Sequence, residues 1–294
     1  MQKVSRVVIA LLIMALAAAS LAQEAAGMAD EGTVEVNGAS IFYSSQGEGE
    51  PMVLIHGYPL SGELFRDNVG PLAASYRVIT VDLRGFGRSE APDDQASIET
   101  YATDVLAVMD ELGIDEAIVG GMSMGGITIF EMVRQAPERL SGIVLIDTVH
   151  LPAATAEAAM WRGVAAQAEE EGVASLVDFL MPDMLSGNAR MNREELVEHL
   201  SGLVEQASLE GAVGGANALA DRPDSTATLG DITVPTLIIV GLEDTLTPFE
   251  VHEEMQGAIE GSELVIIPGA AHASNFEAAE AANEAILEWA NAIE

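Results

Sequence analysis

Short apolar runs alternate with segments of helical spacing along most of this chain, and that alternation most constrains its fold. Each apolar run is bounded by Gly, Pro, Asn or Asp, as strands are, while the intervening segments repeat apolar residues at i, i+3 and i+4. Parallel strands need long crossover connections, which such helices supply. The chain is therefore predicted to be an α/β protein with a mostly parallel sheet flanked by helices. The predicted strands cover residues 33–36, 41–44, 52–55, 77–81, 117–120, 142–146, 236–240 and 263–267.

Turn residues support these boundaries. Asn37-Gly38 separates the first two strands, and an Asn-Gly pair suits the type I′ turn of a hairpin. Gly113 follows the first predicted helix, where glycine commonly ends a helix. The main predicted helices cover residues 98–112, 127–133, 248–259 and 276–293.

The alternation stops between residues 150 and 230. This stretch has no strand pattern and is rich in Ala, Glu and Met at helical spacing. We predict that residues 150–230 form a helical cap inserted into the fold. Residues 23–149 and 231–294 then form one α/β core.

The first 22 residues have the pattern of a secretory signal peptide. Lys3 and Arg6 form a positive region, residues 7–19 are apolar, and a small-x-small site predicts cleavage after Ala22. The apolar run is too short to span a bilayer. We therefore expect a secreted or periplasmic protein with no membrane span after cleavage.

The charge of the chain is strongly negative. It contains 12 Lys and Arg residues against 47 Asp and Glu residues, a net charge of −35, so nucleic acid and anionic membranes are excluded as partners. Cys is absent, which excludes disulfides and a catalytic thiol. Beyond residue 22 the basic residues are all Arg. A salt-adapted source explains this composition, and a codon bias that replaces Lys by Arg is the alternative.

The sequence Gly121-Met122-Ser123-Met124-Gly125 lies between a predicted strand and a predicted helix. A serine at such a tight turn has a strained backbone, and the two glycines leave room for it. The N-terminus of the following helix favours negative charge beside the serine. Ser123 is the candidate nucleophile.

A serine nucleophile needs a base, and the base needs an orienting acid. His272 follows the last predicted strand, and Asp244 follows the strand before it. Parallel strands place these loops at the same sheet edge as Ser123. Asp147, after the strand at 142–146, is the alternative acid. The order Ser, Asp, His is that of enzymes with a nucleophile elbow.

With these residues, the sequence resembles the α/β-hydrolase family over essentially the whole chain beyond residue 22. The motifs that carry the resemblance are His56-Gly57-Tyr58-Pro59, residues 82–89, residues 121–126, Asp244 and His272. Arg222-Pro223-Asp224 is similar to the subgroup of esterases and 3-oxoadipate enol-lactone hydrolases. The resemblance implies an α/β-hydrolase fold, a Ser123–His272–Asp244 triad, and an oxyanion hole formed by the backbone N–H groups of Tyr58 and Met124.

The implied activity is hydrolysis of a small-molecule carboxylic ester or lactone through an acyl-enzyme, with no cofactor and no metal. Epoxide opening and dehalogenation are disfavoured, because those relatives use Asp as the nucleophile. A cofactor-free perhydrolase is an alternative, since the same triad serves both reactions. A weakly catalytic ligand receptor on the same fold is the alternative from another class. The pattern predicts no particular oligomeric state.

The remaining polar candidates have structural interpretations. His56 is expected to hold the oxyanion loop, and Arg84 and Arg88 to brace residues 82–89. His150 is a candidate for the pocket mouth, whereas His199 and His252 are expected to be solvated. Several cap side chains are expected either to face the substrate or to pack the cap onto the core, namely Met160, Trp161, Phe179, Met181, Met184 and Met191.

The acidic composition leads to a prediction about salt. Repulsion among the carboxylates weakens as salt shortens the Debye length to about 3 Å at 1 M. We expect the melting temperature to rise by about 5 °C or more between low salt and molar NaCl. Chloride is used because sulfate also strengthens apolar burial. A melting temperature that is flat or falls with NaCl would contradict salt adaptation.

Overall fold

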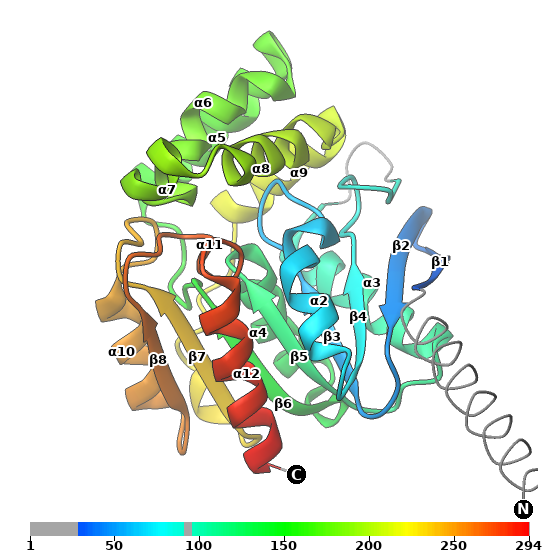
Figure 1. The fold of residues 1–294 in the computed structure, drawn as a ribbon. Helices are drawn as coiled ribbons and strands as arrows, with labels where there is room; N and C mark the ends of the chain where they lie inside the picture. Colours follow the sequence, from blue (N-terminus) through cyan, green and yellow to red (C-terminus); the bar gives the residue numbers. More distant parts are fainter. Residues whose placement is uncertain (1–28, 91–95, 294) are drawn as a thin grey trace, which may run out of the picture.

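The computed structural model describes residues 29–90 and 96–293. Its centre is an eight-stranded sheet of order β1-β2-β4-β3-β5-β6-β7-β8 (Figure 1). The β1/β2 and β2/β4 pairs are antiparallel and the other pairs are parallel, which confirms the predicted mostly parallel sheet. The strands are β1 (Asp30–Val36), β2 (Ala39–Gln46), β3 (Pro51–Ile55), β4 (Arg77–Val81), β5 (Ala117–Met122), β6 (Leu140–Ile146), β7 (Thr236–Gly241) and β8 (Glu263–Ile267).

The leading hairpin turns where the sequence predicts. Asn37 and Gly38 have φ of 49° and 77°, and positive φ at both central residues is the requirement of a type I′ turn. Every residue of β5 and β7 is buried. Strands buried on both faces read as continuous apolar runs, which is why these were identifiable.

Helices cover both faces of the sheet (Figure 1). The helices α2 (Arg66–Leu72) and α12 (Ala279–Ile293) pack together on one face, and α3 (Ile98–Glu111) and α4 (Met124–Gln135) on the other. Ser97 caps α3 by accepting the Thr100 N–H, and Gly113 follows the helix with φ of 65°. The helix α10 (Phe249–Ala258) packs on β7 and β8.

The segment between β6 and β7 is helical. Its α-helices lie over the carboxyl edge of the sheet, where β5, β7 and β8 end (Figure 1). We call this helical segment the cap. Its α-helices are α5 (Thr155–Glu171), α6 (Leu176–Met184), α7 (Gly187–Asn192), α8 (Glu194–Gln206) and α9 (Leu209–Ala220).

The cap meets the core at a close backbone contact. A Cβ on Gly211, in the first turn of α9, would lie 2.1 Å from the Gly85 carbonyl oxygen. The same oxygen accepts the N–H and the hydroxyl of Ser208, at 3.1 and 2.8 Å. Residues without side chains on both sides of the contact therefore allow the cap to reach the loop at 82–89.

Buried charges hold that loop. Arg84 donates to both carboxylate oxygens of Asp104 at 2.6 Å, and both side chains are fully buried. Asp82 accepts the backbone N–H groups of Gly62 and Arg88 at 2.7 and 2.8 Å. Arg88 also stacks on a ring from β2. Arg84 and Arg88 thus brace their loop, as predicted.

The prediction of one continuous helix at the C-terminal end is wrong. Instead of one helix at 276–293, the chain forms α11 (Ser274–Glu277), a break at Ala278, and α12. The Glu277 carbonyl accepts from Arg193 at 2.6 Å. The Glu277 carboxylate binds the N–H and hydroxyl of Ser186. The bond from Arg193 occupies a backbone carbonyl that a continuous helix would use, and the bonds to Ser186 hold the Glu277 side chain toward the cap.

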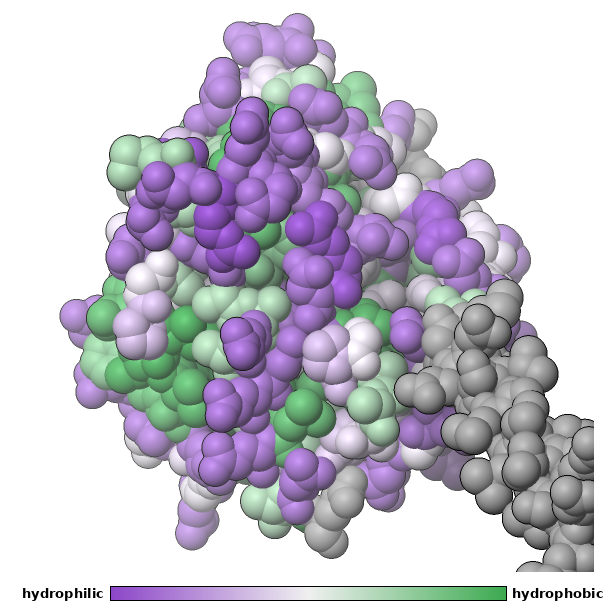
Figure 2. All heavy atoms as spheres, in the orientation of Figure 1, coloured by the Kyte–Doolittle hydropathy of each residue, from purple (hydrophilic) through white to green (hydrophobic). Residues whose placement is uncertain are grey.

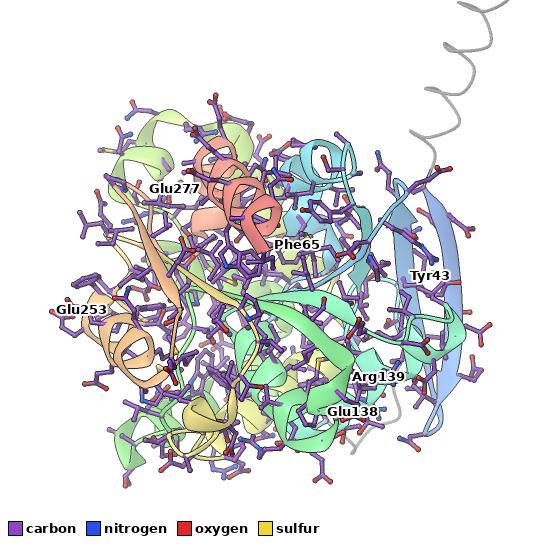
Figure 3. The ribbon with its side chains drawn as sticks, turned by 90° about the horizontal axis from the view of Figure 1, so that it is seen from below. Tyr43, Phe65, Glu138, Arg139, Glu253 and Glu277 are labelled. Carbon is purple, nitrogen blue, oxygen red and sulfur yellow. The ribbon has the colours of Figure 1, made fainter. Side chains whose placement is uncertain are left out.

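Hydrophilic side chains cover much of the face seen in Figure 2. Glu253 of α10, for example, points away from the core (Figure 3). Among the described residues, every helix is too short or too polar to cross a membrane.

The backbone contact between cap and core can be tested with Gly211→Ala. The added Cβ would collide with a carbonyl oxygen, so we expect a loss of about 1–3 kcal/mol in the free energy of unfolding. Urea unfolding of the variant measures this loss. Gly163→Ala on α5 is the matched control, because a Cβ there meets no atom within 4 Å and Ala favours a helix. Equal stability of the two variants would show that the contact is not tight.

Candidate active site

Ser123 occupies the sharp turn between β5 and α4. Its backbone has φ of 52° and ψ of −114°, and its N–H donates to the Ile146 carbonyl at 2.9 Å. A Cβ on Gly125 would lie 2.1 Å from the Ile55 carbonyl oxygen, and one on Gly121 would lie 2.4 Å from the Gly125 carbonyl carbon. Both positions therefore need glycine for the turn to form.

The structure brings Ser123, His272 and Asp244 together. His272 Nε2 lies 2.9 Å from Ser123 Oγ, and His272 Nδ1 lies 2.8 Å from Asp244 Oδ2. His272 and Asp244 are buried, whereas Ser123 is partly exposed. The arrangement is a continuous chain of hydrogen bonds from an accessible hydroxyl to a buried carboxylate. It is the geometry that proton transfer from the serine requires.

The electrostatics favour the charged form of the His272–Asp244 pair. Burial alone would raise the pKa of Asp244, but the imidazole and the bonds from Thr247 outweigh it and lower that pKa. Burial alone would lower the pKa of His272, but the Asp244 carboxylate, together with Asp147 and Asp183, outweighs it and raises that pKa. Asp244 Oδ1 also accepts the N–H groups of Leu246 and Thr247, at 2.8 and 3.0 Å. These bonds fix the carboxylate before any substrate is present.

Tyr58 and Met124, the predicted oxyanion donors, lie on a loop and at the start of α4, two segments that contact each other. Met124 is the first residue of α4, where a backbone N–H has no carbonyl four residues earlier in the helix. A Cβ on Gly57 would lie 2.5 Å from Met122 Sδ and 3.1 Å from Ser123 Cβ. The loop that carries Tyr58 is therefore packed directly against the turn that carries the serine.

The cap holds the side chain of Tyr58. Its hydroxyl donates to the Ala212 carbonyl of α9 at 2.8 Å. Its ring contacts Phe86 and Trp161 edge to face, with centroids 6.1 and 5.5 Å apart. A Cβ on Gly215 would lie 2.8 Å from the same ring. The loop that carries Tyr58 is thus fixed by both the core and the cap.

His56 has the structural role predicted for it. Its Nε2 accepts the Leu83 N–H and its Nδ1 donates to the Gly57 carbonyl, each at 2.9 Å. Burial lowers its pKa and keeps the ring neutral, as this pattern of one acceptor and one donor requires.

The prediction that His252 and His199 are solvated is wrong for His252 and holds in part for His199. His252 is buried, accepts the Thr148 N–H at 3.2 Å and lies 3.1 Å from the Pro248 carbonyl. His199 is only partly exposed and contacts the Glu63 carbonyl at 3.0 Å. Helical periodicity could not reveal the contacts with Thr148 and Glu63, because these two residues lie outside the helices that carry His252 and His199.

Asp147, the alternative acid, does not bind the imidazole. Its carboxylate accepts the backbone N–H groups of Gly241 and Ser274. His150 is buried, and burial lowers its pKa. Its place at a pocket mouth stays a prediction.

The predicted cap side chains divide between packing and exposure. Trp161 packs on Tyr58, and Met181 and Met184 are buried. Phe179 and Met191 are 40% and 79% exposed. Packing therefore explains Trp161, Met181 and Met184, whereas Phe179 and Met191 stay candidates to face the substrate.

Sequence reasoning missed two residues that support the site. Thr247 donates to Asp244, and its position three residues later is a signal that an Asx-type turn could have revealed. Glu277 accepts the N–H of Ala271, next to His272, at 3.0 Å. No local signal marks Glu277, since its other partner is Ser186 in the cap.

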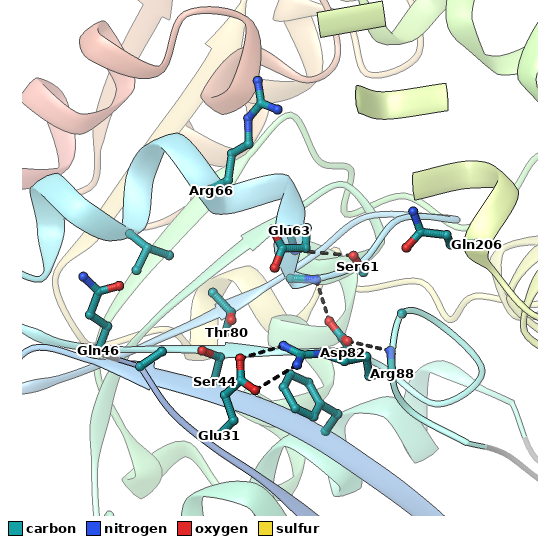
Figure 4. Close-up of a pocket in the computed structure, with 15 residues that line it drawn as sticks. Glu31, Ser44, Gln46, Ser61, Glu63, Arg66, Thr80, Asp82, Arg88 and Gln206 are labelled. Atoms are coloured by element: carbon teal, nitrogen blue, oxygen red, sulfur yellow. Dashed lines mark hydrogen bonds and ion pairs between the residues drawn. The ribbon is translucent and has the colours of Figure 1, made fainter. Parts of the chain in front are cut away.

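A cavity of about 450 Å³ lies elsewhere, beside β2 and β4 (Figure 4). The Arg88 guanidinium binds Glu31 there, and Asp82 binds the neighbouring backbone. The described residues that line it do not include Ser123, Asp244 or His272. The described part of the chain also holds no group of three His, Asp or Glu residues arranged to bind a metal ion.

Comparison with known proteins places the chain in a family. Residues 50–279 match the family described as the alpha/beta hydrolase fold, and the chain belongs to that family. A thermophilic esterase from Thermogutta terrifontis has 31% sequence identity and a TM-score of 0.86, over 91% of this chain and 99% of the esterase chain. The family assignment predicted from the motifs is confirmed.

Two curated relatives extend the comparison. The 3-oxoadipate enol-lactonase 2 of Acinetobacter baylyi is 29% identical over 256 residues, covering 86% of this chain and 94% of the relative. The non-heme chloroperoxidase of Streptomyces lividans is 32% identical over 233 residues, covering 74% and 84%.

The buried state of His252 predicts a dependence of stability on pH. Burial lowers the pKa of His252 from 6.5 to about 4. Between these two pH values the imidazole is protonated in the unfolded chain and neutral in the folded chain. We expect this residue alone to cost about 2–4 kcal/mol of unfolding free energy as the pH falls from 6.5 to 4. Urea unfolding at pH 7.5 and 4.5 should show a smaller fall for His252→Gln than for the unmodified protein. Parallel pH dependences would contradict a buried neutral ring.

Proposed function

We propose that this α/β-hydrolase cleaves carboxylic esters or lactones through an acyl-enzyme formed on Ser123. The observation that carries the proposal is the hydrogen-bonded chain from Ser123 Oγ through His272 to Asp244. The similarity to an esterase and to an enol-lactonase supports ester bonds as the reacting group.

In the proposed mechanism, Ser123 Oγ attacks the substrate carbonyl carbon while His272 Nε2 takes the hydroxyl proton. The resulting oxyanion accepts hydrogen bonds from the N–H groups of Tyr58 and Met124. His272 then gives the proton to the leaving alcohol oxygen, and the acyl group remains on Ser123. Water attacks this ester with His272 again as the base, which releases the acid and restores the serine.

Asp244 orients the imidazole and stabilises its protonated form. The bond between Asp244 Oδ2 and His272 Nδ1 leaves Nε2 directed at the serine. Because the pKa of Asp244 is lowered and that of His272 is raised, the pair supports the imidazolium that forms in both steps.

The charge of the chain favours an uncharged substrate. With a net charge of −35, the protein repels anionic esters at low salt, so association with a neutral ester or lactone is faster. Export by the N-terminal residues 1–22, which lie outside the described residues, is part of this proposal and suits a substrate found outside the cytoplasm.

Perhydrolysis is a second candidate. Hydrogen peroxide would attack the acyl-enzyme in place of water and release a peracid. The similarity to a non-heme chloroperoxidase favours this reaction. Peracid formation from acetate and peroxide, compared with ester hydrolysis by the same preparation, tests it.

The proposed acyl-enzyme predicts the effect of Ser123→Ala. We expect kcat/KM for short p-nitrophenyl esters to fall about 10³-fold or more, because the nucleophile is lost. A fluorophosphonate should label Ser123 in the unmodified protein, with the adduct located by peptide mass.

Ser262→Ala is the matched control, since this serine lies before β8, at the opposite edge of the sheet. It should keep the turnover and the label. A folded protein without adduct or turnover would overturn the proposal and favour the ligand receptor.

A further inference from the structure

Four consecutive backbone N–H groups hold the loop that carries His272. Ala271 donates to the Glu277 carboxylate, and His272 donates to the Asp183 carbonyl at 3.3 Å. Ala273 donates to the Met184 carbonyl at 2.9 Å. Ser274 donates to Asp147 Oδ2 at 2.9 Å. Of these four bonds, the last joins the loop to the central sheet, since Asp147 directly follows β6.

The other oxygen of Asp147 holds the neighbouring loop. Asp147 Oδ1 accepts the N–H of Gly241 at 2.8 Å, three residues before Asp244. One carboxylate therefore bridges the end of β7 and the start of α11. Asp147 is fully buried and has φ of 43°, a backbone conformation that Asp adopts more readily than most residues.

The bridge requires an acceptor at both oxygens. An ionised carboxylate accepts at each oxygen, whereas an amide offers one acceptor and one donor. An asparagine at this position would direct N–H against N–H at either Gly241 or Ser274. The geometry thus favours an ionised carboxylate at position 147. Among the described residues, no Arg or His side chain forms an ion pair with this carboxylate, since His272 pairs with Asp244.

Charged and titratable groups from several elements surround this carboxylate. Asp244 lies after β7, His272 after β8, and His252 on α10 binds the adjacent Thr148 N–H. Asp183 on α6 acts on the far side of His272. Burial, and then the charge of Asp244, raise the pKa of Asp147 to about 7, while His272 opposes that rise. Asp147 in turn helps to raise the pKa of His272.

We propose that Asp147 is a positioning residue of the triad, which clamps the His272 loop to the Asp244 loop and whose negative charge stabilises the imidazolium. This inference rests on the proposed esterase function. Asp147 acts through the two backbone amides and through space, because the hydrogen bond to the imidazole comes from Asp244.

The test is the pH profile of kcat/KM for a p-nitrophenyl ester with Asp147→Asn in the full chain. Loss of the charge lowers the pKa of His272, so the acid limb should move to lower pH by about half a unit or more. Loss of the clamp should lower kcat about tenfold or more above pH 8, with KM nearly unchanged, since the side chain is buried. The two profiles should converge below pH 6, where the native Asp147 is itself protonated.

Asp82→Asn is the matched control. Asp82 is also a buried carboxylate that accepts two backbone N–H groups, but it lies in the loop beside β4. It should lower stability and leave the acid limb in place. An unmoved acid limb in Asp147→Asn, or equal displacement in both variants, would overturn the proposal.

A measurement on the unmodified protein keeps the proposal testable if Asp147→Asn does not fold. Carboxyl NMR of protein labelled with ¹³C at Asp should show one resonance that titrates near pH 7. The imidazole resonances of His272 should report the same step. If instead the Asp147 carboxyl keeps the chemical shift of a protonated acid up to pH 9, the charge assigned to Asp147 is wrong. This result is independent of turnover, so it separates failure of the clamp from failure of the esterase proposal.

Discussion

The backbone of Ser123 is the constraint on which the rest of the structure depends. Its positive φ turns the chain from β5 into α4 in one residue, and that turn closes only because glycines lie two residues away on each side. The turn pushes Gly125 against the end of β3, so the loop at 56–58 must pass beside the serine. The order of strands then decides which other loops can reach Ser123, and the loops after β7 and β8 supply Asp244 and His272.

Carboxylates organise this edge of the sheet. Asp244 fixes its own loop, Asp147 bridges two loops, and Glu277 joins the His272 loop to the cap, each by accepting backbone N–H groups. Backbone amides are donors that every loop already has, so the arrangement needs few basic side chains. A chain with 12 Lys and Arg residues against 47 acids can therefore build a rigid site from the charges it has in excess.

The sheet and the contact among Ser123, His272 and Asp244 were predictable because both leave local signals in the sequence. β4 and β8 have the predicted bounds, because turn-forming residues such as Gly, Asp and Ser lie at the ends of each apolar run. His272 and Asp244 were found because each follows a strand. The break before α12 and the buried state of His252 were not predictable in this way. Their causes are contacts with Ser186, Arg193 and Thr148, which are distant in sequence and have no periodic signal.

The hydrogen bond from the Tyr58 hydroxyl to the Ala212 carbonyl affects how an enzyme with this fold can evolve a preference for a different substrate. In the proposed mechanism the cap lies over the substrate, and α9 also anchors the loop that carries Tyr58, a proposed donor to the oxyanion. A displacement of α9 that admits a larger acyl group therefore also shifts the amide of Tyr58. If Tyr58 supplies an oxyanion donor as proposed, substrate selectivity and turnover are mechanically linked, and divergence toward new esters disturbs turnover least at cap positions that leave α9 in place.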